Sequence, residues 1–392
     1  MLLTMPVTVR SFAKINLGLY IGATRPDGFH ELRTVYQTIG LHDAICVEVV
    51  RGSGIEIRCA DPRVPADASN TCYRMVERGM AALRAKGRVI LEIEKRLPVQ
   101  GGLGGASSNA VAALLALERA LGKELSGAER LRIAAEVGSD LPLFLLGGTV
   151  LGVGRGEEVY PAPDLPATVC VIAMPEIGVS TPKAFADWDA LQSRNEKPAE
   201  LRSAWTLRLR SGQALEGGRP HVGGADAGSR ARVERGSQGE NPKTESTNAD
   251  RAKLTGADPS DRMIELGRVI SSWLSGVPRG KTRGRVSGVP ALGRGRAETL
   301  LLDLVRTGIE NDFAQVVFPQ YPELRDVKGV LERAGAYYAA LSGSGSALYG
   351  LFRSKAAAAK AVIRLRKEGI PAQATVTLTR PQYWKKFQVS SF

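Results

Sequence analysis

The stretch Pro98-Val-Gln-Gly101-Gly102-Leu103-Gly104-Gly105-Ala106-Ser107-Ser108-Asn109-Ala110 carries four glycines and two adjacent serines. It follows an apolar, strand-like run over 89–93 and opens a helical pattern over 109–121. Glycines let a ligand approach the backbone closely, and a helix N-terminus offers unpaired N–H groups to an anion. The two serine hydroxyls suit a phosphate group or Mg²⁺. The stretch therefore predicts a phosphate-binding loop between a strand and a helix.

The same stretch differs from the two common phosphate-binding motifs. It lacks the GK[ST] ending of the P-loop and does not fit G-x-G-x-x-G. Taken alone, it is explained equally well as a glycine-rich turn that precedes a core helix. Both interpretations stay open on this stretch, so the remainder of the chain has to decide between them.

The composition describes a protein with a sizeable core. The chain has 392 residues, of which 43% are hydrophobic and 24% charged, a size and balance that suggest two domains and exclude a wholly disordered chain. No run approaches the roughly 18 apolar residues that a membrane-spanning helix needs, and no secretory signal is visible at the N-terminus. Four cysteines without CxxC spacing are typical of thiols in a reducing cytosol, so we expect a cytoplasmic protein.

The basic charge is unevenly distributed. Of the net charge of +13, residues 191–300 carry 20 Lys/Arg against 12 Asp/Glu. An arginine-rich cluster over 279–296 could contact nucleic-acid phosphates, but it has no interleaved aromatics beyond Trp273 and no recognised module. We therefore predict that 195–296 is a Gly/Arg-rich, poorly ordered insertion and that nucleic acid is not a partner.

Around this segment, strands and helices alternate. Ser126 and Glu129 form a capping-box pattern that starts a helix ending near Gly138. A further short helix is expected over 261–274, inside the segment, and another from Thr299. The predicted strands are 7–9, 15–21, 44–50, 89–93, 169–173, 347–352 and 374–379. The remaining predicted helices are 73–85, 109–121, 321–334 and 356–368.

Three polar residues lie out of pattern. Asp140 follows a helix end in an otherwise apolar run, where a carboxylate is costly unless it has a partner or a function. Lys14 lies inside an apolar strand, and Asn16 shares its face of that strand. An Asp after a helix is also a common turn former, and a lysine is also common at a strand edge.

Six pieces of the chain, in this order, resemble the GHMP kinase family. They span 8–190 and 299–379, and the resemblance fails over roughly 195–296. The pieces are AKINLGL (13–19), RPDGFHEL (25–32), PVQGGLGGASSNA (98–110), GSDLPLFL (138–145), NDFAQVVF (311–318) and SGSGSALYGLF (342–352).

The resemblance implies an α/β fold of two domains and a phosphotransferase. An N-terminal ATP-binding domain would span 1–165, and a C-terminal ferredoxin-like domain would comprise 166–194 and 297–392. ATP and Mg²⁺ would be the cofactors. The glycine loop and RPDGFHEL match the branch whose substrate is a cytidine-diphosphate-linked methylerythritol, phosphorylated on its 2-hydroxyl in isoprenoid precursor synthesis. A monomer or homodimer without membrane partners is expected.

The resemblance also implies residue roles. Asp140 would be the general base, and Lys14 would orient it and stabilise charge on the attacking oxygen. The metal ligands stay unknown. The implied ATP-binding residues are Pro98, Gly101, Gly102, Leu103, Gly104, Gly105, Ala106, Ser107 and Ser108. The implied substrate-binding residues are Asn16, Phe29, His30, Phe185, Ser342, Gly343 and Ser344.

Two positions depart from the family pattern, and three alternative functions stay open. Phe29 stands where the family usually has Tyr, and Ala106 stands where it has Gly, which matters only if that residue needs a positive φ. A related GHMP kinase of the homoserine or mevalonate type is the nearest alternative. A nucleic-acid-binding protein and an inactive relative are further ones.

Overall fold

The computed structural model describes residues 5–99, 101–195 and 310–387. The chain divides into two units, of which the second has only 189–195 among its described residues. All the structure below belongs to the first unit, except the last turns of one helix. The predicted insertion over 195–296 lies outside the described residues except for Asn195, the last residue of a helix. The predicted helix over 261–274, the helix from Thr299 and the arginine cluster lie outside them altogether.

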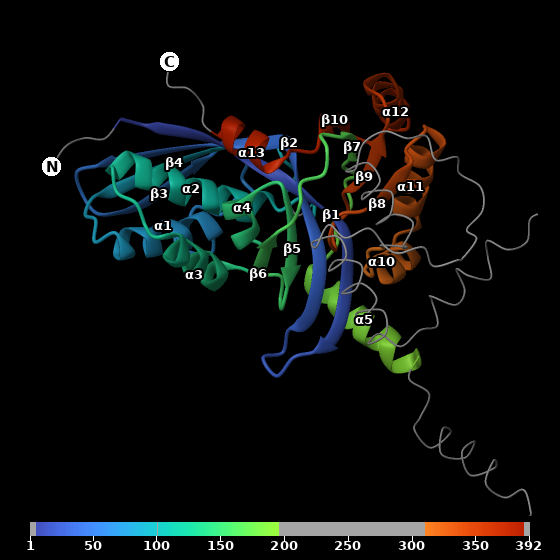
Figure 1. The fold of residues 1–392 in the computed structure, drawn as a ribbon, viewed down its shortest axis with the longest axis horizontal. Coiled ribbons are helices and arrows are strands. Elements are labelled where there is room, and N and C mark those ends of the chain that lie inside the picture. The colour runs from blue at the N-terminus through green and yellow to red at the C-terminus, as the bar shows by residue number, and fades with distance from the viewer. Residues whose placement is uncertain (1–4, 100, 196–309, 388–392) are drawn as a thin grey trace, which may run out of the picture. The chain divides into compact units, whose positions relative to one another are not determined.

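Among the described residues, six strands form the first sheet (Figure 1). The sheet has the order β3-β4-β2-β5-β6, and β1 pairs with β2 as a long antiparallel hairpin. Only the β3–β4 pair is parallel. The strands are β1 (Val7–Thr24), β2 (His30–Val50), β3 (Gly54–Cys59), β4 (Arg88–Glu94), β5 (Thr149–Val153) and β6 (Glu158–Pro161).

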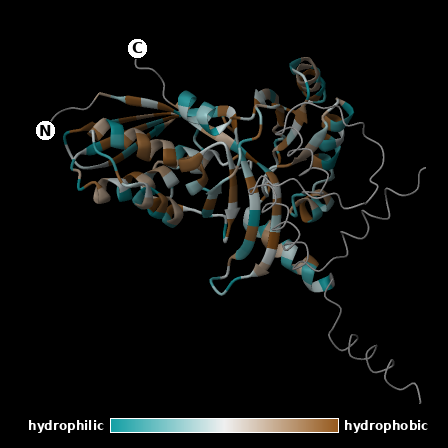
Figure 2. Cartoon of the chain, in the orientation of Figure 1, coloured by the Kyte–Doolittle hydropathy of each residue, from teal (hydrophilic) through white to brown (hydrophobic). Residues whose placement is uncertain are grey.

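The helices beside this sheet form the larger core. The second of them, α2 (Gly105–Leu121), is apolar on nearly all sides and is therefore buried. It ends where Gly122 adopts φ +60°, a conformation that favours glycine. Figure 2 shows hydrophobic residues along the strands and on the helices that pack there. The other helices are α1 (Thr71–Ala82), α3 (Gly127–Val137) and α4 (Pro142–Leu146).

A second, four-stranded antiparallel sheet has the order β10-β7-β9-β8. Strand β9 is buried along its whole length, consistent with its central place. The strands are β7 (Val169–Ala173), β8 (Tyr338–Leu341), β9 (Leu348–Phe352) and β10 (Ala372–Val376). The remaining helices are α5 (Thr181–Asn195), α10 (Ala314–Gln320), α11 (Pro322–Arg333), α12 (Lys355–Lys367) and α13 (Arg380–Phe387).

The end of the described chain returns to the first sheet. The phenol of Tyr383, on α13, donates a hydrogen bond to the Phe144 carbonyl at 2.8 Å, and its ring lies 5.5 Å from that of Phe12 on β1. Near β10, Ile39 of β2 forms an isolated bridge with Thr377. The α/β fold class is confirmed, whereas the domain boundaries at 165 and 194 stay predictions.

The sequence patterns predicted α1, α2, α3, α11 and α12 but missed α4, α5, α10 and α13. The capping box of Ser126 and Glu129 is present, with both reciprocal hydrogen bonds. The sequence patterns missed that the first two strands run over 18 and 21 residues, and they missed β3, β5, β6 and β8 altogether. Polar residues in the first half of β2 hide its strand pattern, because several of them are buried.

All four cysteines lie in the described residues and are free thiols. Cys72 and Cys170 are buried, whereas Cys46 and Cys59 are partly buried. The sequence suggested buried thiols, which holds for Cys72 and Cys170 but not for Cys46 and Cys59. No helix of the described residues is long and apolar enough to cross a membrane.

Candidate active site

Lys14 and Asp140 meet beside the first sheet. Lys14 lies on β1, and Asp140 lies in the turn between α3 and α4, where Pro142 starts α4. Lys14 Nζ is 3.6 Å from Asp140 Oδ2, and the side chains are 4% and 37% exposed. The ammonium is therefore enclosed, whereas the carboxylate remains accessible to a substrate hydroxyl. The structure brings the two residues together, and their catalytic roles stay predictions.

The enclosure of Lys14 has an electrostatic consequence. Burial lowers the pKa of the Lys14 ammonium from its ordinary value of 10.5, and the neighbouring Asp140 carboxylate opposes that shift. Lys14 Nζ also donates a hydrogen bond to Asn16 Oδ1 at 2.7 Å. The amide of Asn16 donates in turn to Thr34 Oγ1 at 2.7 Å. Lys14 and Asn16 therefore share one face of β1, as the sequence predicted.

Tyr36 is a site residue that the sequence reasoning missed. Its hydroxyl donates a hydrogen bond to Asp140 Oδ1 at 3.2 Å, and its ring centroid lies 5.7 Å from Lys14 Nζ. Burial and the Asp140 charge raise the pKa of the phenol well above 10, so it stays a donor at physiological pH. The β1–β2 register pairs Tyr36 with Asn16. A correct prediction of β2 and its pairing could have found it.

The two glycine loops pack directly against each other. Ser342 Oγ donates a hydrogen bond to the Gly102 carbonyl at 3.0 Å, and Ala347 N donates to the Gly101 carbonyl at 3.1 Å. A Cβ on Gly102, which has φ +77°, would lie 2.2 Å from the Ser342 carbonyl oxygen. Only glycine permits this approach. Lys14 N donates to the Leu103 carbonyl at 2.9 Å, which ties the first loop to β1.

The second glycine loop, 342–346, reaches the Lys14 side chain. A Cβ on Gly343 would lie 3.5 Å from both Lys14 Nζ and Asn16 Oδ1. The loop is held by Asn311, whose amide donates to the carbonyls of Leu341 at 3.0 Å and Gly343 at 2.6 Å. The predicted residue Gly343 therefore lies beside Lys14 and Asn16, and Asn311 is a supporting residue that the sequence reasoning did not single out.

The start of α2 faces the first glycine loop with an open N-terminus. Gly104 is the N-cap with φ +70°, and the first turn of α2 holds no acidic residue. Ser107 is partly exposed, whereas Ser108 is buried with its hydroxyl 2.7 Å from Ser11 Oγ. Ala106 is exposed in the helix and does not have a positive φ, so alanine fits where the family has glycine.

The aromatic residues predicted for the cytidine end lie in two places. The rings of His30 and Phe185 are stacked, with centroids 4.8 Å apart and planes 16° apart. Phe313 meets Phe185 edge-on at 4.9 Å. Phe29 is 51% exposed and lies under the Arg155 guanidinium, 4.8 Å from ring to Cζ. The structure brings His30 and Phe185 together and pairs Phe29 with Arg155.

The described residues contain no cluster of three His, Cys, Asp or Glu that could hold a metal ion. A divalent cation at the glycine loop would therefore need oxygen ligands from elsewhere, such as phosphate groups, water and serine hydroxyls. Ser107 is partly exposed and of the right chemical kind for this, whereas Ser108 is buried with its hydroxyl beside Ser11 Oγ.

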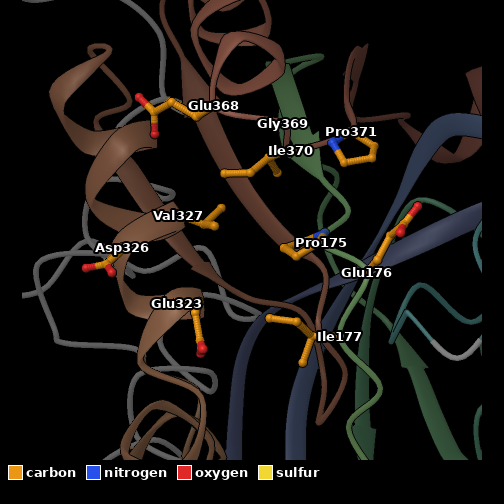
Figure 3. A pocket seen from close by; sticks show the side chains of 10 residues that line it. All are labelled: Pro175, Glu176, Ile177, Glu323, Asp326, Val327, Glu368, Gly369, Ile370 and Pro371. Atoms are coloured by element: carbon orange, nitrogen blue, oxygen red, sulfur yellow. The ribbon is translucent and has the colours of Figure 1, made fainter.

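A separate cavity of about 380 Å³ lies beside β7 and α11 and shares no residue with the predicted site. In Figure 3, Val327 and Ile370 point toward each other across it, whereas the carboxylates of Asp326 and Glu368 point away. Its lining offers no buried polar group and is not the candidate active site.

Comparison with known proteins decides the family. The sequence matches the GHMP kinases N terminal domain over 70–148 and the GHMP kinases C terminal domain over 290–370. It is 33% identical over 354 residues to the 4-diphosphocytidyl-2-C-methyl-D-erythritol kinase of Solibacter usitatus, covering 90% of this chain and 84% of that relative. The chain belongs to the GHMP kinase family. The resemblance inferred from the sequence pieces is confirmed.

Other GHMP kinases agree with this assignment. A 4-diphosphocytidyl-2-C-methyl-D-erythritol kinase of Saccharopolyspora erythraea is 41% identical over 206 residues, covering 50% of this chain and 64% of that relative. A crystal structure of 4-(cytidine 5'-diphospho)-2C-methyl-D-erythritol kinase matches with a TM-score of 0.58 at 24% identity, covering 94% and 98% of the two chains. The L. major mevalonate kinase also matches with a TM-score of 0.58, at 13% identity and 96% and 99% coverage. At these identities the structures support the fold.

Proposed function

We propose that this GHMP kinase transfers the γ-phosphoryl group of ATP to the 2-hydroxyl of 4-diphosphocytidyl-2-C-methyl-D-erythritol. The observation that carries the proposal is the pair of Lys14 and Asp140 beside two packed glycine loops, 3.6 Å apart at Nζ and Oδ2. The choice of substrate follows from relatives, 33–41% identical to this chain, that are named for this substrate.

Asp140 is the general base of the proposed reaction. Its carboxylate is 37% exposed, so it can accept the proton of a bound alcohol as the oxygen attacks phosphorus. The Lys14 ammonium then stabilises negative charge on the attacking oxygen. Because Lys14 is anchored by Asn16 and enclosed by Gly343 and Gly104, its charge has a fixed position before substrate arrives.

The first glycine loop and the start of α2 hold the nucleotide phosphates. Backbone N–H groups at the N-terminus of α2 are free of a capping side chain, and their dipoles favour an anion. The second glycine loop lies on the first, so it closes the phosphate site from the other sheet. Phosphoryl transfer depends mainly on this positioning and on charge neutralisation.

Mg²⁺ accompanies the nucleotide in the proposed reaction. A cation there would be held mainly by phosphate oxygens and water, with the partly exposed Ser107 as the candidate protein ligand. The ion would neutralise phosphate charge.

The stacked rings of His30 and Phe185 form a surface on which a flat aromatic group at the other end of the substrate could bind. A cytosine ring has the shape and π-surface to bind against Phe185, with His30 as a polar neighbour. We extend the proposal to a cytoplasmic enzyme, because four free thiols suit a reducing compartment. A monomer or homodimer stays the expectation from the family resemblance.

The substrate assignment is tested by competition among alcohols. The purified enzyme with ATP and Mg²⁺ is given 4-diphosphocytidyl-2-C-methyl-D-erythritol, homoserine or mevalonate, and the phosphorylated products are measured. We expect product from the cytidyl substrate, and inhibition of that reaction by cytidine diphosphate. Phosphorylation of homoserine or mevalonate alone would assign the chain to another branch of the family.

A further inference from the structure

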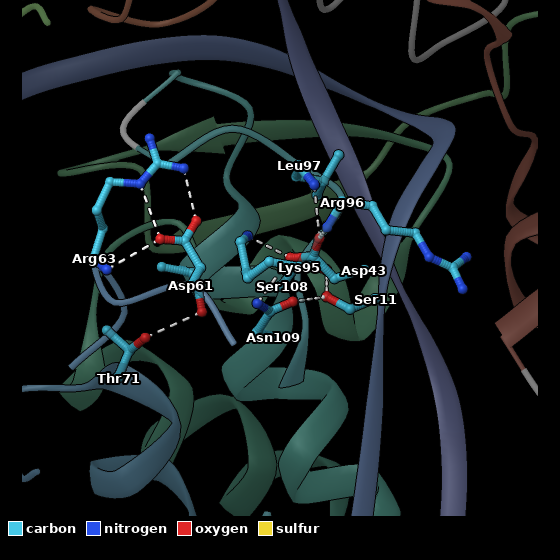
Figure 4. Close-up of polar contacts among 11 residues, drawn as sticks. Ser11, Asp43, Asp61, Arg63, Thr71, Lys95, Arg96, Leu97, Ser108 and Asn109 are labelled. Carbon is cyan, nitrogen blue, oxygen red and sulfur yellow. Dashed lines mark hydrogen bonds and ion pairs between the residues drawn. The ribbon is translucent and has the colours of Figure 1, made fainter. Parts of the chain in front are cut away.

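A buried carboxylate beneath the first glycine loop has no role in the reaction as described. Asp43, on β2, is 0% exposed, yet four donors surround it (Figure 4). Lys95 Nζ lies 2.5 Å from Oδ2, and Asn109 Nδ2 donates to the same oxygen at 2.9 Å. The backbone N–H groups of Arg96 and Leu97 donate to Oδ1 at 2.7 and 2.8 Å.

The four donors flank the nucleotide loop. Lys95, Arg96 and Leu97 lead directly into the loop at Pro98, and Asn109 lies in the second turn of α2, just after it. One carboxylate therefore fixes both ends of the segment that is proposed to bind the phosphates. A core that needed only stability could use apolar side chains here, because a buried ion pair is seldom more stable than a hydrophobic replacement.

The network continues to the serine pair of the loop. Asn109 Oδ1 accepts a hydrogen bond from Ser11 Oγ at 2.6 Å, and Ser11 Oγ is also 2.7 Å from Ser108 Oγ. Ser11, Ser108 and Asn109 are all buried, so no water competes for these contacts. Asp43 thus orients the Asn109 amide, which in turn sets the orientation of the serine hydroxyls.

Lys95 connects the network to the start of α2. Its side chain is 9% exposed, and its Nζ lies 3.4 Å from the place that a Cβ on Gly105 would occupy. Gly105 is the first residue of α2. The lysine lies beside the helix N-terminus, where an anion binds, but its charge is paired with the Asp43 carboxylate, so its contribution is to hold this part of the loop in place.

We propose that Asp43 is a positioning residue for nucleotide binding, which acts through Lys95 and Asn109 on the glycine loop and on Ser108. The inference rests on the proposed function, because it assumes that the loop binds ATP. Asp43 itself touches no substrate. Its effect is to keep the loop in the arrangement that the phosphates require.

The first test is Asp43→Asn. All four neighbours of Asp43 are donors, and an amide offers only one acceptor oxygen, so its NH2 group faces donors on one side and the contacts on that side are lost. We expect the KM for ATP to rise by about tenfold or more, with the KM for the alcohol substrate unchanged. Glu118→Gln is the matched control. Glu118 is also a buried carboxylate, it lies on α2 as Asn109 does, and it accepts hydrogen bonds from Leu125 N and Arg130 Nε.

A double variant, Asp43→Asn with Lys95→Met, covers the case in which the single variant folds poorly. It leaves no unpaired buried charge, so its melting temperature should exceed that of Asp43→Asn, while its KM for ATP should stay raised. Recovery of the wild-type KM for ATP in the double variant would overturn the inference. An equal rise in this KM for Glu118→Gln would also overturn it, since that result indicates a general loss of stability.

Hydrogen exchange of the loop amides separates this inference from the proposed function. In Asp43→Asn we expect faster exchange over 96–105, with protection of α3 unchanged. If the wild-type chain fails to use ATP while the loop exchanges faster in the variant, the proposed function fails, and what stands is that Asp43 orders the loop. Unchanged exchange over 96–105 would refute the positioning role, whatever the enzyme phosphorylates.

Discussion

The hydroxyl of Tyr36 donates a hydrogen bond to the Oδ1 atom of Asp140, at 3.2 Å. The other oxygen of that carboxylate faces Lys14 Nζ at 3.6 Å, so two groups from the β1–β2 hairpin fix the carboxylate that follows α3. This arrangement orients the candidate base before a substrate binds.

Removal of the Tyr36 hydroxyl tests this orientation. Tyr36→Phe keeps the buried ring and deletes the bond to Asp140, so we expect kcat to fall by about 3- to 10-fold with little change in either KM. Steady-state kinetics measure kcat and the two KM values separately. A rise in the KM for the alcohol substrate at constant kcat would show instead that Tyr36 acts on substrate binding.

The charge of Lys14 predicts an alkaline limit of activity. Because burial lowers the pKa of Lys14 below 10.5, the ammonium loses its proton within the accessible pH range, and the rate falls as pH rises through that pKa. The pKa of Tyr36 is raised well above 10, so its phenol does not contribute to the same limb. A profile of kcat against pH, taken from 7 to about 10.5, measures the limb, and a constant rate over that range would contradict it.

The aromatic pair predicts a selective loss of substrate affinity. Phe185→Ala removes the ring that stacks on His30, so we expect the KM for the cytidyl substrate to rise about 5- to 100-fold with the KM for ATP unchanged. Parallel changes in both KM values would point to damage of the fold instead.

The contact between the glycine loops predicts that one glycine tolerates no side chain. Gly102→Ala would place a methyl group 2.2 Å from the Ser342 carbonyl oxygen, so we expect a large loss of activity. Gly122→Ala is the control: Gly122 also has a positive φ, +60°, but nothing lies within 4 Å of its Cβ position. The control should lose only about 1 kcal/mol of stability and keep its activity. Equal activity of the two variants would show that the loop contact is dispensable.

Much of the site could be predicted from the sequence, because its residues lie in short, distinctive segments. The glycine loop before α2, the out-of-pattern Lys14 and the Asp140 turn each carry a local signal. The helices that were predicted, such as α2 and α3, carry the same kind of signal, since a 3.6-residue period and caps such as Ser126 are local features.

The remainder depends on contacts between distant segments. Tyr36 looks like an ordinary strand residue until the β1–β2 register places it beside Asn16. Asp43 looks like a surface residue until β4 and α2 enclose it, with Lys95 52 residues and Asn109 66 residues away. No periodicity in one segment reports such pairings, so only the structure reveals them.

Asp140→Asn tests the central claim most directly. The variant keeps the size of the side chain but cannot accept the proton of the attacking hydroxyl. The measurement is the rate of phosphoryl transfer from ATP to 4-diphosphocytidyl-2-C-methyl-D-erythritol. We predict a fall in kcat of about 10²–10⁴-fold with both KM values retained. Equal rates for wild type and Asp140→Asn would contradict Asp140 as the general base.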